Sequence, residues 1–254
     1  MSVTDLHPIG DNITFWQERV DLAASFRWTA RLNMHEGVSN HFSLSVNDDG
    51  SQFLMNPNQV HFSLIKASDM LLLDANDPET MNRPGAPDPT AWGLHGALHR
   101  LCPHARCAMH VHSIHATVLA SLKDPVLPMS DQNAALFHGR IVYDTEYGGL
   151  ALDEEAERAC QALKDPSKKV LVMGNHGIMV IGETVAETFN NMYYFERACE
   201  IYIKALWTGH ELAIIPEDVA AQVALEAESH GIEAHRHLDS IKRLLDHSEP
   251  DYKQ

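Results

Sequence analysis

Two histidines stand one residue apart in Met109-His110-Val111-His112-Ser113, near the end of an apolar stretch that is typical of a strand. Side chains two positions apart on a strand point to the same face of a sheet, so His110 and His112 would project together. Imidazole is the commonest metal ligand in proteins, and the chain holds 17 histidines. The pair therefore predicts half of a metal site.

A third ligand is expected, because open catalytic sites for zinc commonly use three protein groups. His115 would complete His110-x-His112-x-x-His115, which is close to the signature of metallo-β-lactamase-like hydrolases, but Ile114 stands where that signature has an aspartate ligand. His176 lies in Gly174-Asn175-His176-Gly177, a turn between two apolar strands where glycine lets the backbone approach closely. A ligand role for His176 would explain why a polar turn lies between apolar strands. This favours His176 over His115 as the third ligand.

The elements that must position these residues follow from the hydrophobic pattern. Helical spacing predicts helices over residues 12–34, 91–100, 114–122, 153–163 and 183–208. Alternation and short apolar runs predict strands over residues 36–46, 52–57, 105–113, 168–173 and 178–181, with a capped turn leading into a strand over 64–74. Residues 76–90 hold four prolines and are expected to form a loop. The pattern favours one α/β or α+β domain with a sheet covered on both faces.

Composition narrows the classes of function. Lys and Arg number 19 against 35 Asp and Glu, and this charge of −16 repels nucleic-acid phosphates and anionic membranes. No apolar run approaches the roughly 20 residues of a spanning helix, and the amino terminus lacks the layout of a secretory signal. The four cysteines do not form a disulfide framework and are expected to be reduced and mostly buried. We expect a cytoplasmic protein that binds neither nucleic acid nor membrane.

Three ordered motifs resemble the class II aldolase and adducin head family. They are Trp92-Gly93-Leu94-His95-Gly96-Ala97-Leu98-His99 and the segments 109–113 and 174–177, with support from Asn40-His41-Phe42-Ser43, residues 53–57 and residues 143–149. The resemblance covers about residues 14–208. It implies a three-layer α/β/α domain over residues 1–208 with a mostly antiparallel central sheet. Residues 209–254 would form a helical extension and a charged tail, frayed or packed on a neighbouring subunit.

The resemblance also implies a site. Carried over by position, the metal ligands are His110, His112 and His176, with zinc expected and manganese or iron as alternatives. Three further residues, Asn40, His41 and His95, are expected to bind substrate, while Tyr143 and Asp144 are the candidates for acid–base catalysis. His95 and His99 lie one helical turn apart and either share a face near the site or cap the helix. The family further implies a homo-oligomer, commonly a tetramer.

One position departs from the aldolases of this family. They carry a catalytic glutamate four residues before the histidine that matches His95, and that position is Ala91 here. Their phosphate-binding elements are also replaced, by Ser39-Asn40-His41 and Pro89-Thr90-Ala91. In both respects the chain is more similar to the adducin-like branch.

These features predict a metal-dependent lyase in which the ion acts as a Lewis acid for an enolate. It would carry out aldol cleavage or decarboxylation of a small hydroxy or keto carboxylate or a sugar-like substrate. Decarboxylation needs no base for its first step, so the loss of the glutamate affects it less. Two alternatives stay open: a non-catalytic adducin-like oligomeric scaffold, and a non-haem iron oxygenase on the same fold.

Overall fold

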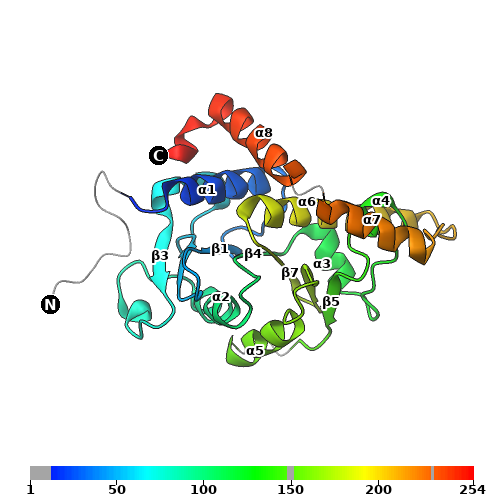
Figure 1. Ribbon diagram of the computed structural model, residues 1–254, viewed down its shortest axis with the longest axis horizontal. Helices are drawn as coiled ribbons and strands as arrows, with labels where there is room; N and C mark the ends of the chain where they lie inside the picture. The colour runs from blue at the N-terminus through cyan, green and yellow to red at the C-terminus, as the bar shows by residue number, and fades with distance from the viewer. Residues whose placement is uncertain (1–12, 148–151, 230–231) are drawn as a thin grey trace.

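The computed structural model describes residues 13–147, 152–229 and 232–254 and contains one central sheet (Figure 1). Its strands are ordered β3-β2-β1-β4-β7-β6-β5. They are β1 (His41–Ser45), β2 (Gln52–Met55), β3 (Leu71–Asp74), β4 (Cys107–Val111), β5 (Ile141–Asp144), β6 (Val170–Met173) and β7 (Gly177–Gly182). All neighbouring strands are antiparallel except β5 and β6, which are parallel. The predicted mostly antiparallel sheet is confirmed.

Helices cover both faces of the sheet, which confirms the three-layer α/β/α architecture (Figure 1). They are α1 (Trp16–Arg31), α2 (Pro89–Leu101), α3 (Ile114–Ala120), α4 (Gln132–Ala135), α5 (Leu152–Ala162), α6 (Val185–Trp207), α7 (Glu217–Ser229) and α8 (Ile232–Ser248). The larger core lies between the sheet and α1, α3, α6 and α8, and it includes Phe26, Phe42 and Phe189. A smaller core between the sheet and α2 and α5 includes Leu98, Leu171 and Ile181.

The alternation of β1 and β4 brings polar side chains onto one face of the sheet. In β4, Met109 and Val111 enter the larger core, whereas His110 faces the layer of α2 and α5. In β1, Phe42 enters the larger core and its neighbours face the other way. Because β1 and β4 pair with His41 opposite His110, these two rings lie side by side.

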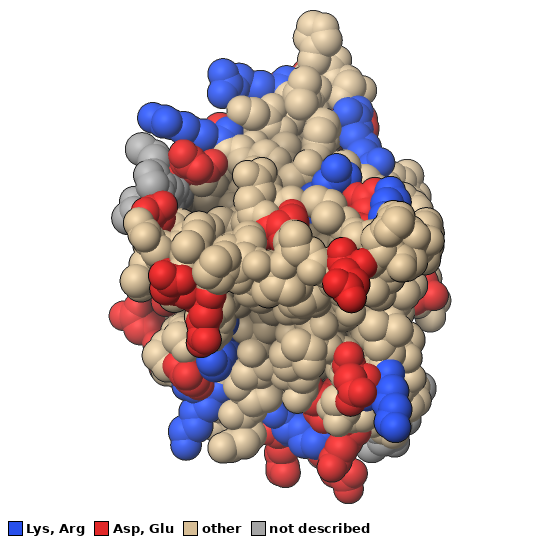
Figure 2. Space-filling model, turned by 90° about the vertical axis from the view of Figure 1, so that its right-hand side faces the viewer, with Lys and Arg blue, Asp and Glu red and all other residues tan. Residues whose placement is uncertain are grey.

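The end of the molecule that carries α4 and α7 shows acidic and basic side chains interspersed (Figure 2). In this region Arg140 pairs with Glu228 at 3.0 Å, and Lys169 pairs with Glu187 at 3.1 Å. Local ion pairs thus neutralise some of the acidic side chains at this end of the molecule.

The described part of the C-terminal segment packs on its own chain and is therefore not frayed, whereas its contact with a neighbouring subunit stays a prediction. Helix α8 buries Leu238, Ile241 and Leu245 in the larger core. The side chain of Tyr252, close to the end of the chain, is also fully buried there. Although the segment is polar on average, an apolar stripe on one side of α8 is enough to anchor it.

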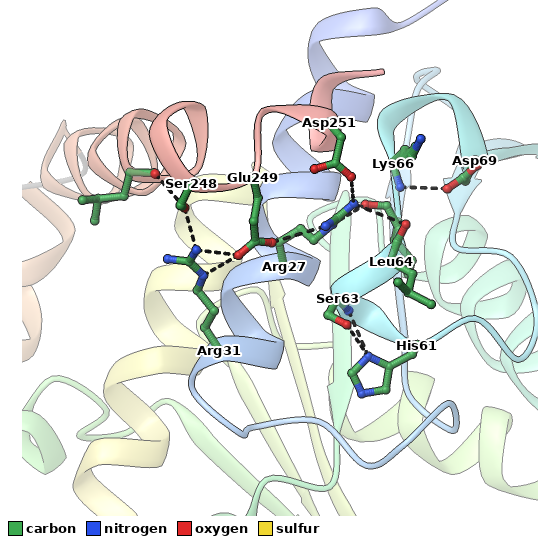
Figure 3. Close-up of polar contacts among 12 residues, drawn as sticks. Arg27, Arg31, His61, Ser63, Leu64, Lys66, Asp69, Ser248, Glu249 and Asp251 are labelled. Carbon is green, nitrogen blue, oxygen red and sulfur yellow. Dashed lines mark hydrogen bonds and ion pairs between the residues drawn. The ribbon is translucent and has the colours of Figure 1, made fainter.

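Ion pairs hold the end of the chain on α1 (Figure 3). The buried guanidinium of Arg27 lies 3.3 Å from Glu249 and 2.8 Å from Asp251. Arg31 donates to Glu249 at 2.7 Å. Arg27 also donates to the carbonyl oxygen of Ile65 at 2.8 Å, so one side chain joins α1 to two distant segments.

Some predictions concern residues outside the described part of the chain. The amino terminus, where no secretory signal is expected, lies within residues 1–12, and residues 148 and 149 of the family-like segment are also outside the described part. All four cysteines lie in the described part, where they are buried and unpaired, as predicted. None of the described helices combines the length and the apolar character that a membrane crossing requires.

Candidate metal centre

Three histidine rings converge where β4 ends and β7 begins. His110 is in β4, His112 directly follows it, and His176 directly precedes β7. One ring nitrogen from each lies within 4.8 Å of the others. The ring centroids are 4.8 Å apart for His110 and His112, 4.8 Å for His110 and His176, and 4.9 Å for His112 and His176. The structure thus brings together the three residues that were expected to bind metal.

The outer nitrogen of each ring is held by an oxygen acceptor. The Nδ1 partners are Ile178 O at 2.9 Å for His110, the Glu36 carboxylate for His112, and Glu155 Oε1 at 2.9 Å for His176. Carbonyl and carboxylate oxygens only accept, so each Nδ1 donates, and in a neutral ring the lone pair is then on Nε2. Such outer contacts are typical of histidines that bind metal.

The inner nitrogens suit a cation. The Nε2 atoms of His110 and His112 are only 2.9 Å apart. When both carry lone pairs, they repel each other unless a positive charge lies between them. The carboxylates of Glu36 and Glu155 add negative charge behind two of the rings. This donor set fits a divalent ion that accepts imidazole nitrogen, such as zinc.

Glu36 and Glu155 were not among the predicted site residues. They lie far from each other and from the histidines in sequence, so no local spacing connects them. Glu36 precedes β1, and Glu155 is on α5; only the folded sheet brings them behind the rings of His112 and His176. In the sequence, Glu155 is only one acidic residue on a polar helix. Such residues are common on solvated helices, so its position does not indicate a role at the site.

Gly177 allows His112 to approach β7. A Cβ atom at this position would lie 2.6 Å from Val111 O and 2.8 Å from Cδ2 of His112. The predicted close approach of the backbone at this turn is therefore confirmed. The left-handed residue of the turn is Asn175, with φ of 55°, and its N–H donates to Ala120 O at 2.9 Å.

Burial favours the neutral form of two of the three rings, His110 and His112. It lowers the pKa of His110 well below the usual range for histidine, and neighbouring His41 adds to the effect. Burial also lowers the pKa of His112, although the hydrogen bond to Glu36 opposes this. Neutral imidazole is the form that binds a metal ion.

The residues expected to bind substrate take two positions. Asn40 and His41 line a small pocket of about 20 Å³ together with Asn56, Asp88 and Ala91. Asn40 Oδ1 accepts from the N–H of Glu36 at 2.7 Å. Its Nδ2 is buried without a hydrogen-bond partner among the described residues. The ring of His41 stacks on that of His110, with centroids 4.8 Å apart.

His95 lies behind His41 rather than in the pocket. Its side chain is fully buried, and its Nε2 is 2.7 Å from Nδ1 of His41. His99, one turn further along α2, is also buried, and burial lowers its pKa to about 4. The same cause lowers the pKa of His41 to about 3. These three rings are therefore neutral near pH 7.

The other candidates are not part of the histidine cluster. His115 Nδ1 is 2.9 Å from Glu196 Oε1, on α6, so His176 and not His115 joins the pair. Tyr143 packs against the larger core, on the sheet face opposite His110, and its hydroxyl accepts the N–H of Leu127 at 3.1 Å. The carboxylate of Asp144 pairs with Arg158 at 2.9 Å. The acid–base role of Tyr143 and Asp144 stays a prediction.

Comparisons with known proteins agree with this geometry. A profile of the family described as "Class II Aldolase and Adducin N-terminal domain" matches residues 20–203. The chain is 30% identical to an aldolase II superfamily protein from Pseudomonas syringae, with a TM-score of 0.84 and coverage of 96% of this chain and 98% of that one.

One further relative and one solved structure with the same fold extend the comparison. Alpha-adducin of Rattus norvegicus is 30% identical over 192 residues, which cover 74% of this chain but only 25% of the adducin. L-fuculose 1-phosphate aldolase from Glaciozyma antarctica shares the fold, with a TM-score of 0.78 over 97% of both chains, at 19% identity. The chain belongs to the class II aldolase and adducin family.

Proposed function

We propose that the protein is a metal-dependent lyase that cleaves a carbon–carbon bond in a small hydroxy or keto carboxylate or a sugar-like substrate. The observation that carries this proposal is the convergence of three imidazoles, each held by an oxygen acceptor on its outer nitrogen. When bound there, a divalent ion, with zinc expected and manganese or iron as alternatives, stabilises negative charge on a carbonyl oxygen during bond cleavage. His110, His112 and His176 would hold it.

The pocket beside the histidines favours decarboxylation over aldol cleavage. Ala91 cannot remove a proton from a substrate hydroxyl, and general acid–base catalysis is typically worth about 10²- to 10⁴-fold in rate. No Lys or Arg is among the described residues that line this pocket, whereas the carboxylate of Asp88 is. Negative charge at this position disfavours a phosphorylated substrate. Asn40 Nδ2 is a free donor for a carbonyl or carboxylate oxygen.

A homo-oligomer, commonly a tetramer in this family, is part of the proposal. Exposed apolar side chains lie on α3 and near the end of α6, among them Ile114, Val118, Leu206 and Trp207. Trp207 is 75% exposed in the single chain, and a second copy would cover it. We expect the protein to be cytoplasmic. Light scattering should give a mass well above the 28.4 kDa of one chain, and the mass of one chain would contradict the proposed oligomer.

The activity test is a screen of 2-keto and β-keto acids, with fuculose and rhamnulose phosphates included. Protein loaded with zinc, manganese or iron is assayed for metal-dependent release of carbon dioxide or aldehyde, beside its His112→Ala variant. We expect release from a keto acid by the wild type only. Bound metal without turnover would favour the adducin-like scaffold, and oxygen uptake by the iron form would favour the oxygenase. Ordinary rates on a sugar phosphate would contradict the argument from Ala91.

A further inference from the structure

A buried chain of hydrogen bonds runs from His41 away from the metal centre. His41 Nδ1 is 2.7 Å from His95 Nε2, and His95 Nδ1 contacts the hydroxyl of Ser43. The same hydroxyl is 2.7 Å from His99 Nε2, and His99 Nδ1 is 2.8 Å from Ala105 O. The four linked side chains are 0% to 6% exposed.

The carbonyl oxygen of Ala105 sets the direction of every bond in this chain. It can only accept, so Nδ1 of neutral His99 donates and its Nε2 must accept. The single proton of the Ser43 hydroxyl therefore goes to His99, and the hydroxyl accepts from Nδ1 of His95. Nε2 of His95 then accepts from Nδ1 of His41. Each neutral ring is thereby fixed in one tautomer.

The chain leaves one acceptor at its open end. No other described residue forms a hydrogen bond with Nε2 of His41, whose ring bonds through Nδ1 to His95. The ring stacks on the ligand His110 and lines the pocket that also holds Asp88 and Ala91. Ala91 is the position where aldolases of the family carry a carboxylate, which would accept a hydrogen bond. His41 offers an acceptor in the same pocket from the neighbouring strand.

We propose that Ser43 and His99 are positioning residues: acting through His95, they hold His41 so that its Nε2 accepts a hydrogen bond from a substrate hydroxyl at the metal centre. This proposal rests on the metal-dependent function proposed above. The substrate class it selects is a compound with a hydroxyl next to the group that binds the metal. Without these hydrogen bonds, His41 could adopt the other tautomer, and its Nε2 would then be a donor.

Two small metal chelators that differ by one hydroxyl test this proposal. Glycolohydroxamate and acetohydroxamate bind a metal through the same group, and only the first carries a hydroxyl. Their dissociation constants are measured by calorimetry on the zinc-loaded protein, on Ser43→Ala and on the matched control Ser45→Ala. Ser45 is on the same strand and is buried, and its hydroxyl donates to Asn47 O at 3.0 Å. A hydrogen bond predicts a roughly 2- to 10-fold preference for glycolohydroxamate.

We expect this preference in the wild type and in Ser45→Ala, and its loss in Ser43→Ala while acetohydroxamate binding stays unchanged. Equal affinity for the two probes in the wild type, or an unchanged preference in Ser43→Ala, would overturn this proposal and leave the metal-dependent function unaffected. If neither probe binds the zinc-loaded wild type, the metal-dependent function fails, and the proposal fails with it.

A second measurement does not depend on the folding of a variant. Long-range nitrogen–proton NMR correlations of histidine-labelled, zinc-loaded wild type distinguish the two neutral tautomers of each ring. We expect His41, His95 and His99 all to carry their proton on Nδ1. A proton on Nε2 of His41 or His95 would overturn the proposal.

Discussion

At the scale of single residues, the candidate metal centre includes side chains that hold the three histidines from behind. The Glu155 carboxylate accepts from His176 at 2.9 Å and is itself largely buried, with 14% of its side chain exposed. It therefore fixes the orientation of the ring, the nitrogen that carries the proton and the basicity of the other nitrogen. Glu36 acts on His112 in the same way from a more exposed position.

Glu155→Ala is expected to weaken zinc binding by about 10- to 100-fold, because His176 loses the acceptor that orients it. The affinity is measured by competition with a chelator of known strength. Glu154→Ala is the matched control, since Glu154 is the exposed neighbour on the same helix. Equal zinc affinity of the two variants would show that Glu155 has no role at the centre.

Gly177→Ala is expected to disturb both the fold and the metal centre. The added Cβ would lie 2.6 Å from a backbone oxygen, and backbone cannot move aside as a flexible side chain can. We expect a loss of about 1–3 kcal/mol in the free energy of unfolding, together with weaker zinc binding. Gly93→Ala is the control, because a Cβ meets nothing within 4 Å there and alanine favours the helix. Unfolding in urea measures both variants, and equal stability would contradict the steric account.

At the scale of elements, the C-terminal segment belongs to the core of the domain. Tyr252 is fully buried, and its hydroxyl donates to Asp246 at 3.0 Å. Ion pairs from Arg27 and Arg31 on α1 hold the segment beside it. The segment thus stabilises α1 and α8 on the face of the sheet opposite the pocket.

Tyr252→Ala is expected to lower the free energy of unfolding by about 3 kcal/mol, since it removes a buried ring from the larger core. Tyr252→Phe keeps the ring and loses only the hydrogen bond to Asp246, so a loss of about 1 kcal/mol is expected. Urea unfolding gives both values, and zinc content should stay unchanged. Similar stability of Tyr252→Ala and the wild type would mean that the segment is not anchored as described.

The sequence pattern predicted the elements whose burial is strongly one-sided. Helices α1, α2, α5 and α6 fall within a few residues of their predicted bounds, and the spacing of His110 and His112 predicted their common face. Strand β5 was missed because all four of its residues are only half buried, so no alternation marks it. Helix α4 was not predicted either, because its four residues are too few to show a helical period.

The supporting part of the site could not be predicted because it is built from distant segments. Glu36, Ser43 and Glu155 come from three separate elements and meet the histidines only after the sheet has formed. In the sequence, nothing distinguishes Ser43 from other strand residues. Only the pairing of β1 in the sheet places its side chain beside α2. The His-x-His spacing and the family motifs therefore predicted the three histidines that converge, whereas their hydrogen-bond partners became visible only in the fold.

At the scale of the whole molecule, the buried histidines make stability depend on pH. His99 is 2% exposed, and burial lowers its pKa to about 4 from 6.5. Between these values the unfolded chain binds more protons than the folded one. The contribution of His99 to the free energy of unfolding is therefore complete above about pH 6.5. It is lost as the pH falls towards 4, at up to about 1.4 kcal/mol per pH unit.

His99→Gln should remove this dependence. We expect the stability difference between wild type and variant to shrink as the pH is lowered from neutral to about 4.5, because only the wild type must bury a ring that would otherwise be protonated. Urea unfolding over this range measures it. A difference independent of pH would contradict a neutral, buried His99.

The account depends most on the three converging imidazoles, so metal stoichiometry tests it most directly. Three proteins are purified without chelator: the wild type, His112→Ala and the control His115→Ala. Each is dialysed against zinc and then against buffer, its zinc content is measured by elemental analysis, and circular dichroism verifies that it is folded. The account predicts one ion per chain in the wild type and in His115→Ala, and none in a folded His112→Ala, because an open site contributes less to folding than the core does. Full zinc content in the double variant His110→Ala, His112→Ala would contradict it.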